Sequence, residues 1–217
     1  MRNKTKALLV ALCAVMLVAV GILGTLAYLT SSDTAVNTFT VGKVAIKLDE
    51  AKVDPVTGAA VTPSERVKEN SYHLMPGHSY VKDPTVTVLD GSEDCYVRML
   101  VKVNDISKLT SAMPKAAFPT FYNGDLFLLQ TLCGGWDKDV WLYEGYNNGE
   151  YEFRYHKAVN GKGGDNELPA LFSTITVPGE ITSDLMPNLA GVEITVVAQA
   201  IQADGFATAN AAWAQWK

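Results

Sequence analysis

The sequence predicts an all-β fold, a jelly-roll-like β-sandwich with one or two short helices, preceded by an N-terminal signal helix. Three observations support this expectation. Apolar and polar residues alternate over short segments, glycine and proline turns separate those segments, and no long helical periodicity precedes residue 125. With 217 residues, of which 48% are hydrophobic and 19% charged, the chain suits one sandwich domain.

Short alternating segments mark the expected strands. Residues 96–103 are the clearest case, because every second residue is apolar while Arg98 and Lys102 fall on the opposite face. Residues 193–201 are apolar at nearly every position, which predicts a strand in the centre of its sheet. Gly42 predicts a bulge or bend in the first strand. Strands are expected over residues 39–48, 86–88, 96–103, 140–144, 150–159, 174–177 and 193–201.

Turn and helix signals separate these strands. Polar residues 50–71 predict a long loop, and Asn148-Gly149 predicts a hairpin turn. Leucines recur at helical spacing over residues 126–132, and residues 207–216 are rich in alanine, so each of these segments predicts a short helix.

The first 27 residues predict an export signal. Three basic residues and no acidic one precede an apolar run over residues 7–24, and small residues follow at the −3 and −1 positions of a cut after Ala27. At eighteen residues the run also reaches the lower limit for a membrane span, so a retained anchor is the alternative. The expected organisation is a signal peptide over 1–27, a flexible segment over 28–37 and one domain over 38–217.

We expect cleavage between Ala27 and Tyr28, because small residues stand at −3 and −1 after the apolar run. N-terminal sequencing of the exported protein should therefore begin at Tyr28. Replacing Ala27 with a bulky charged residue should leave the precursor in the membrane. An exported protein that still begins at Met1 would show a retained anchor instead.

Charge limits the partners of the mature chain. Removal of residues 1–27 takes away three of the 18 basic residues and none of the 23 acidic ones, which leaves a net charge of −8. This charge disfavours nucleic acid and anionic lipid as partners. Membrane contact is expected only through the uncleaved signal.

The sequence predicts no catalytic residue, no metal site and no cofactor. It contains no zinc-protease, nucleophile-elbow, phosphate-loop, dinucleotide or CxxC motif. Three weaker patterns fit either a site or a structural role: histidines as zinc ligands, an acidic turn as a calcium site, and tryptophans as a sugar platform. These residues are His73, His78 and His156; Asp90, Glu93 and Asp94; and Trp136, Trp141, Trp213 and Trp216.

The mature chain retains two cysteines, Cys95 and Cys133. An exported protein can oxidise such a pair, and two isolated buried thiols are the alternative. A domain of this size has an ample core and does not need a disulfide, so free thiols are favoured.

Three groups of residues resemble one known family. The first group is 24–30 with 37–42 and 48–50, the second runs from 75–77 through 82–84 to 96–98, and the third is 198–206. Together they resemble the TasA/camelysin (CalY) family of Gram-positive bacteria, whose members are exported through a SipW-type signal peptidase. Residues 104–190 take no part in the resemblance.

The resemblance implies a sandwich secreted to the cell surface or biofilm matrix, where it self-assembles into extracellular fibres. The segment freed by cleavage would complete the sheet of the next subunit, which makes a second copy the head-to-tail partner. Addition of an extended segment to an open sheet edge is a general mode of recognition. The implied donor residues are Tyr28, Leu29, Val36 and Phe39, among residues that are mainly polar.

Two other functions stay open at this point. A secreted surface binding module for carbohydrate or protein would use aromatic residues on an exposed face. The camelysin branch has been described as a metalloprotease, which makes a metallopeptidase the other alternative, although no zinc-binding motif supports it.

Overall fold

The computed structural model describes residues 42–113 and 126–216, together with eight residues between 3 and 14. Residues 42–217 form one compact unit and residues 1–41 form another. The described residues of the first unit are helical. The described part of the chain contains no helix with the length and hydropathy of a membrane span.

Two sequence-based expectations lie outside the described residues. These are the cleavage site at Ala27 and Tyr28, and the donor segment with Leu29, Val36 and Phe39. Both stay predictions.

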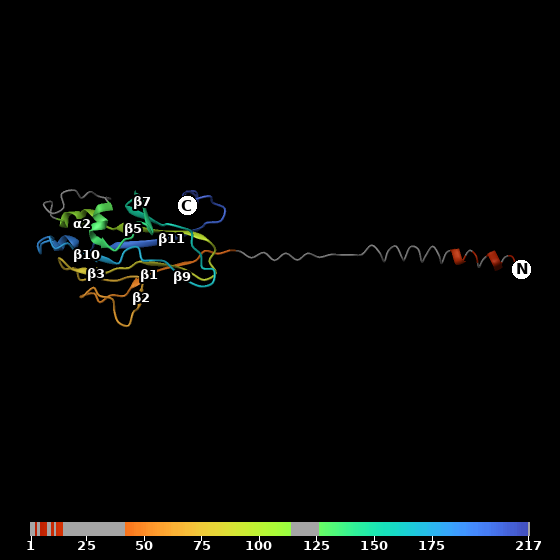
Figure 1. Ribbon diagram of the computed structural model, residues 1–217, viewed down its shortest axis with the longest axis horizontal. Coiled ribbons are helices and arrows are strands. Elements are labelled where there is room, and N and C mark those ends of the chain that lie inside the picture. Colours follow the sequence, from red (N-terminus) through yellow and green to blue (C-terminus); the bar gives the residue numbers. More distant parts are fainter. Residues whose placement is uncertain are drawn as a thin grey trace. The chain divides into compact units, whose positions relative to one another are not determined.

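Three antiparallel sheets build the described part of the domain, which confirms the predicted all-β, sandwich-like fold (Figure 1). The first sheet has the order β2 (Arg66–Val67), β1 (Ile46–Ala51), β4 (Thr85–Val88), β9 (Asn166–Glu167). The second has the order β3 (Ser79–Val81), β10 (Thr174–Thr176), β6 (Cys133–Gly134). The third has the order β11 (Ile194–Gln202), β5 (Cys95–Val103), β8 (Glu150–Tyr155), β7 (Trp141–Asn147).

The hydrophobic core follows the strand alternation. In β5, Val97, Met99 and Val101 are fully buried, as the pattern of residues 96–103 predicts. Val86 and Val88 of β4 belong to the same core cluster. Because alternate residues of a strand point to opposite faces, one face of each of these strands supplies the core.

The β7–β8 hairpin confirms the predicted turn. Asn148 and Gly149 have φ angles of 53° and 86°, and both values lie in the left-handed region that a two-residue type I′ turn requires. Beyond the turn the strands stay in register from Asn147 and Glu150 to Tyr143 and Phe153, except for one bulge.

Among the described residues of the domain, four helical segments accompany the sheets, where the sequence predicts one or two short helices. They are α2 (Ile106–Ala112), α3 (Leu126–Leu132), the 3₁₀ helix η1 (Met186–Leu189) and α4 (Ala209–Trp213). The sequence predicts α3 and α4 but not α2, because Met113-Pro114 dominates that region as a turn signal. The Asp105 carboxylate accepts the Lys108 backbone N–H at 3.0 Å and caps α2.

Two strand expectations need correction at the N-terminal side of the domain. Regular strand β1 begins at Ile46, and Gly42 lies before it and forms no bulge within it. The expected loop over residues 50–71 includes the end of β1 and the short strand β2, which pairs with Glu50 and Ala51.

The apolar run of 193–201 predicts a central strand, and this prediction is wrong. In the described sheet β11 lies at the edge. Its inner residues pack on the core, whereas Val197 on the outer face is 43% exposed. Apolar residues on both faces of a strand indicate that the strand is buried, but they do not indicate how many strands pair with it. The prediction of two neighbouring strands for β11 was therefore wrong, because the described sheet gives it one.

Candidate functional site: a groove between two strand edges

Two of the strands with an open edge in the described part of the chain, β11 and β1, matter for the site. β11 pairs with β5 through all nine of its residues and has no second partner there. β1 pairs with β4 over residues 46–49, while β2 reaches only Glu50 and Ala51 on the other side. Residues 46–49 therefore also present an edge without a neighbouring strand.

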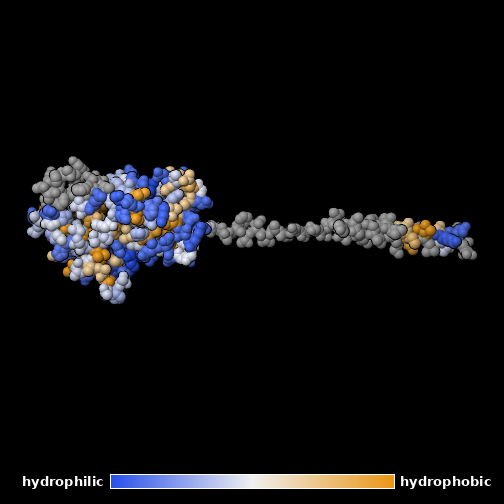
Figure 2. Space-filling model, in the orientation of Figure 1, coloured by the Kyte–Doolittle hydropathy of each residue, from blue (hydrophilic) through white to orange (hydrophobic). Residues whose placement is uncertain are grey.

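A groove of about 1130 Å³ lies between these two edges. Its apolar lining includes Ile46 and Leu48 of β1, Ile194 and Val196 of β11, Leu109 of α2 and Leu189 of η1. Figure 2 shows hydrophobic residues, in orange, interrupting the mostly hydrophilic surface of the domain. The volume lies near the upper end of the roughly 300–1,000 Å³ range of small-molecule pockets, and the open strand edges beside it suit an extended peptide.

The edge of β11 lacks the usual protection against strand addition. Natural edge strands carry charged residues, prolines or bulges that prevent pairing with another chain. The nine residues of β11 include no charged residue and no proline, and they pair with β5 without a register shift. This edge can accept a further strand.

The pairing of the described strands shows in which directions β1 and β11 run beside the groove. Lys43 forms a parallel bridge with Ser92, so β1 and β5, which follow these two residues, start from one end of the domain and run in the same direction. We call this end, with Gly42, Lys43 and Ser92, the entry end. Because β11 is antiparallel to β5, Ile194 lies opposite Val103 at the other end, which we call the far end.

Much of the groove lining lies toward the far end. Residues 193–198 of β11 line it, and so do residues 68–72, which follow β2 beyond the last residues of β1. The first described residues of the domain, Gly42 and Lys43, lie at the entry end, and the β11 residues that line the groove lie in the half of that strand toward the far end.

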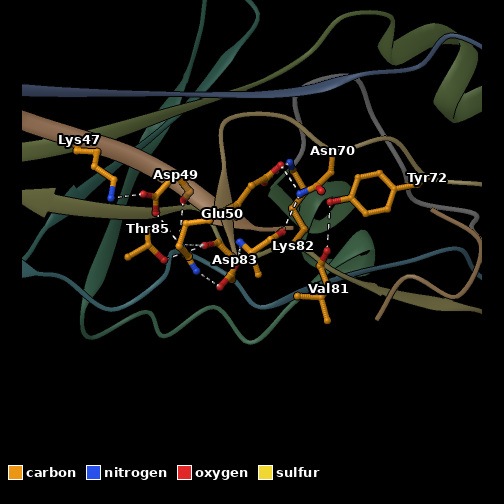
Figure 3. Close-up of polar contacts among 11 residues, drawn as sticks. Lys47, Asp49, Glu50, Asn70, Tyr72, Val81, Lys82, Asp83 and Thr85 are labelled. Atoms are coloured by element: carbon orange, nitrogen blue, oxygen red, sulfur yellow. Dashed lines mark hydrogen bonds and ion pairs between the residues drawn. The ribbon is translucent and has the colours of Figure 1, made fainter. Parts of the chain in front are cut away.

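A buried ion pair forms the polar wall of the groove (Figure 3). Lys82 Nζ lies 2.7 Å from Glu50 Oε2, and both residues are groove-lining and more than 90% buried, at 8% and 6% exposure. Asn70 donates to Glu50 Oε1 at 3.0 Å and to the Ala51 carbonyl oxygen at 2.8 Å. Alternation along β1 places Glu50 on the inward face with Ile46 and Leu48.

The environment of Tyr72 reflects this buried negative charge. Its hydroxyl donates to the Val81 carbonyl oxygen at 3.1 Å. Burial, and secondly the Glu50 carboxylate, raise the pKa of Tyr72 well above its usual value. The phenol therefore stays neutral and a hydrogen-bond donor at any physiological pH.

A second set of ion pairs holds the outer face of β1. Arg66 contacts Asp49 at 2.9 Å and Asp83 at 2.6 Å, and Lys47 contacts Asp49 at 2.6 Å. Burial opposes ionisation of Asp49, but the hydrogen bonds from Lys47 and Arg66 outweigh it and lower the pKa of this carboxyl. These contacts tie β2 and the residues before β4 to β1, which forms one side of the groove.

The two candidate disulfide residues are free thiols in different sheets. Cys95 begins β5 and Cys133 begins β6, and both are buried. Burial raises the pKa of Cys95 to about 11 and that of Cys133 to about 12. Both thiols are therefore poor nucleophiles near neutral pH.

We expect the mature protein to contain two unreactive thiols. Alkylation of the folded protein at pH 8 should be negligible, because a thiol of pKa about 11 is ionised in roughly one molecule in a thousand at that pH. Alkylation under denaturing, non-reducing conditions should add two groups per chain, counted by mass spectrometry. A mass that shows no added group under those conditions would mean a disulfide.

The remaining candidate residues take part in contacts within the domain. The Asp94 carboxylate accepts from Asn160 and Lys162, and His156 Nδ1 lies 3.2 Å from the Val140 carbonyl oxygen. Among the described residues, no group of three or more histidine, cysteine, aspartate or glutamate side chains is placed to hold a metal ion.

The four tryptophans do not form a common platform. Trp141 is fully buried and donates to the Pro169 carbonyl oxygen, and Trp136 donates to the carbonyl oxygen of Trp141. Trp213 and Trp216 pack against each other, and the Arg98 Cζ lies 4.3 and 5.5 Å from their ring centroids. Trp216 is 41% exposed and Trp213 is buried, so the contact between Trp213 and Arg98 joins the C-terminal helix α4 to β5.

Sequence reasoning missed the groove and its ion pair. One signal was present: a strand that alternates Ile46, Leu48, Glu50 places a carboxylate on the face that should be apolar. A carboxylate on that face needs a buried partner of opposite charge. The sequence does not indicate which residue this is, and the fold identifies it as Lys82.

Comparison of the chain with protein-family models, with curated proteins and with solved structures gave no match.

Proposed function

We propose that the protein is a secreted structural subunit of the cell surface or biofilm matrix that forms fibres by donor-strand exchange. Residues 28–41 of one copy would lie in the groove between β1 and β11 of the next copy. The observation that carries this proposal is the groove itself, which lies between two open strand edges and has apolar residues of β1, β11, α2 and η1 in its lining. The resemblance of the N-terminal residues to the TasA/camelysin family supports the same function, together with export by a SipW-type peptidase.

The chain path favours insertion into another copy over insertion into the same copy. Lys43 is bridged to Ser92, the Glu93 backbone N–H donates to the Lys43 carbonyl oxygen, and the Ala45 N–H donates to Ser92 Oγ. To reach its own groove, the preceding segment would have to reverse direction within a few residues of Gly42. Insertion into a neighbour needs no such turn.

The geometry gives a polymer that does not close. A donor that leaves at the entry end and an acceptor that opens at the far end make a head-to-tail contact between two different surfaces. Heterologous contacts of this kind generate open filaments unless a rotation closes them into a ring. Fourteen residues, 28–41, reach about 46 Å when extended, which is longer than the roughly 30 Å of nine-residue β11.

The expected affinity is modest and depends on apolar burial. Each backbone hydrogen bond of the added strand contributes about 1 kcal/mol net. Burial of a large apolar side chain such as Phe39 contributes about 1.5–3 kcal/mol. Fixing each residue opposes binding by about 1–2 kcal/mol, so the balance is close and assembly should depend on protein concentration.

The test uses the mature chain with a bulky folded tag fused directly to Tyr28. The tagged protein should stay monomeric by light scattering, and proteolytic removal of the tag should start the growth of fibres visible by negative-stain microscopy. The mature chain without residues 28–37 is the control and should not assemble. Fibres that grow equally well with the tag in place, or a mature chain that stays monomeric at high concentration, would contradict donor-strand exchange.

A further inference from the structure

We propose that the buried Glu50–Lys82 pair is the recognition point for the inserted strand, and that it receives the side-chain amide of Asn37 from the neighbouring copy. This inference rests on the proposed function and specifies the contact that sets the register of the strand.

The ion pair has unused hydrogen-bonding capacity toward the groove. An ammonium group has three N–H donors, and within the described residues the only acceptor for Lys82 is Glu50. Each Glu50 oxygen accepts one hydrogen bond, from Lys82 or from Asn70, although a carboxylate oxygen can accept two. Buried charged groups without their full set of partners favour a ligand that supplies both an acceptor and a donor.

The alternation of the donor segment selects Asn37. In an extended strand Ala35, Asn37, Phe39 and Val41 share one face, which contains two large apolar residues. The opposite face has only Val36 among threonines. The first face suits the apolar groove, and Asn37 is its one polar residue.

The positions along the groove agree with this choice. Glu50 lies next to the last residue of β1, near the far end where the strand would enter. Residues Phe39 and Val41, which precede the donor's own domain, would then lie nearer the mouth, against apolar residues that α2 and η1 contribute, such as Leu109 and Leu189. Residues before Asn37 would extend along β1 toward Ile46.

A side-chain amide matches both members of the pair. Its oxygen accepts from the Lys82 ammonium, and its NH₂ group donates to the Glu50 carboxylate. It also adds no charge to a buried site that is already neutral. Leucine would leave the ammonium hydrogens facing an apolar group, and aspartate would place a second carboxylate beside Glu50.

The test measures binding of a synthetic peptide of residues 28–41 to the mature chain whose N-terminus is blocked by the fused tag. Fluorescence anisotropy of the labelled peptide gives its dissociation constant. Asn37→Leu in the peptide should weaken binding roughly 10- to 100-fold, the range for loss of a hydrogen bond to a charged group. The matched control is Thr38→Leu, on the opposite face of the strand, which should change the constant less than about threefold.

Equal binding of the wild-type and Asn37→Leu peptides would overturn the inference and leave the proposed function standing. No binding of the wild-type peptide would overturn the proposed function, and the inference with it. As a reciprocal measurement, the receiving chain with Glu50→Leu and Lys82→Met together should prefer the Asn37→Leu peptide. Thermal unfolding shows whether this double variant is folded. If it is not, binding of the wild-type, Asn37→Leu and Thr38→Leu peptides to the unchanged receiving chain tests the inference by itself.

Discussion

Replacing Lys82 with methionine should lower the free energy of unfolding by about 3–5 kcal/mol, the usual effect of removing one partner of a buried ion pair. The substitution keeps most of the side-chain volume but leaves the Glu50 carboxylate in a site that is 6% exposed, with Asn70 as its remaining hydrogen-bond donor. Urea unfolding of the tagged monomer, followed by tryptophan fluorescence, measures the change.

The control is the double variant Glu50→Leu with Lys82→Met, which removes both charges. Because an apolar pair of similar volume often replaces a buried ion pair without loss, the double variant should be close to the wild type in stability. If the double variant is as unstable as Lys82→Met alone, the loss would come from packing around Lys82 and not from an uncompensated charge.

Replacing Val196 with arginine should abolish assembly, with a critical concentration at least about 100-fold higher than that of the wild type. Val196 lines the groove from the inner face of β11, and a charged side chain there would oppose both the apolar contact and the entry of a strand. Sedimentation of polymer as a function of protein concentration measures the effect, and circular dichroism shows whether the variant is folded.

The matched control is Leu142→Arg, the same change on β7 at the opposite edge of the same sheet, where the side chain is already 40% exposed. This variant should assemble like the wild type. Normal fibres from a folded Val196→Arg protein would mean that the added strand does not use this groove, and loss of fibres in Leu142→Arg would implicate the β7 edge.

Local patterns were enough to predict the parts of the fold that depend on near neighbours in the chain. The alternation of β5 gave its buried face, and Asn148-Gly149 gave the hairpin, because both depend on backbone geometry within a few residues. The number of neighbours beside β11 depends on how distant strands are ordered, and no local pattern contains that information. The same holds for the groove, which exists only because β1 and β11 meet with open edges.

The error on β11 has a physical explanation within the proposed function. Its residues are those of a strand with a neighbour on each side, yet the described domain gives it one. A strand donated by another copy would provide the second neighbour. The composition of β11 would then suit the assembled protein and not the isolated domain.

The bridge between Lys43 and Ser92 has a mechanical consequence for such a fibre. Tension along the polymer would enter each domain at Gly42 and pass into β1 along its own axis. From Lys43 to Asp49 the chain is hydrogen-bonded to the Ser92 turn and then to β4, so the load would fall on these bonds together in shear and not on one bond after another. A ladder loaded in this way resists rupture far better than one that is peeled open, so in the proposed fibre the join between donor segment and domain would be a strong point.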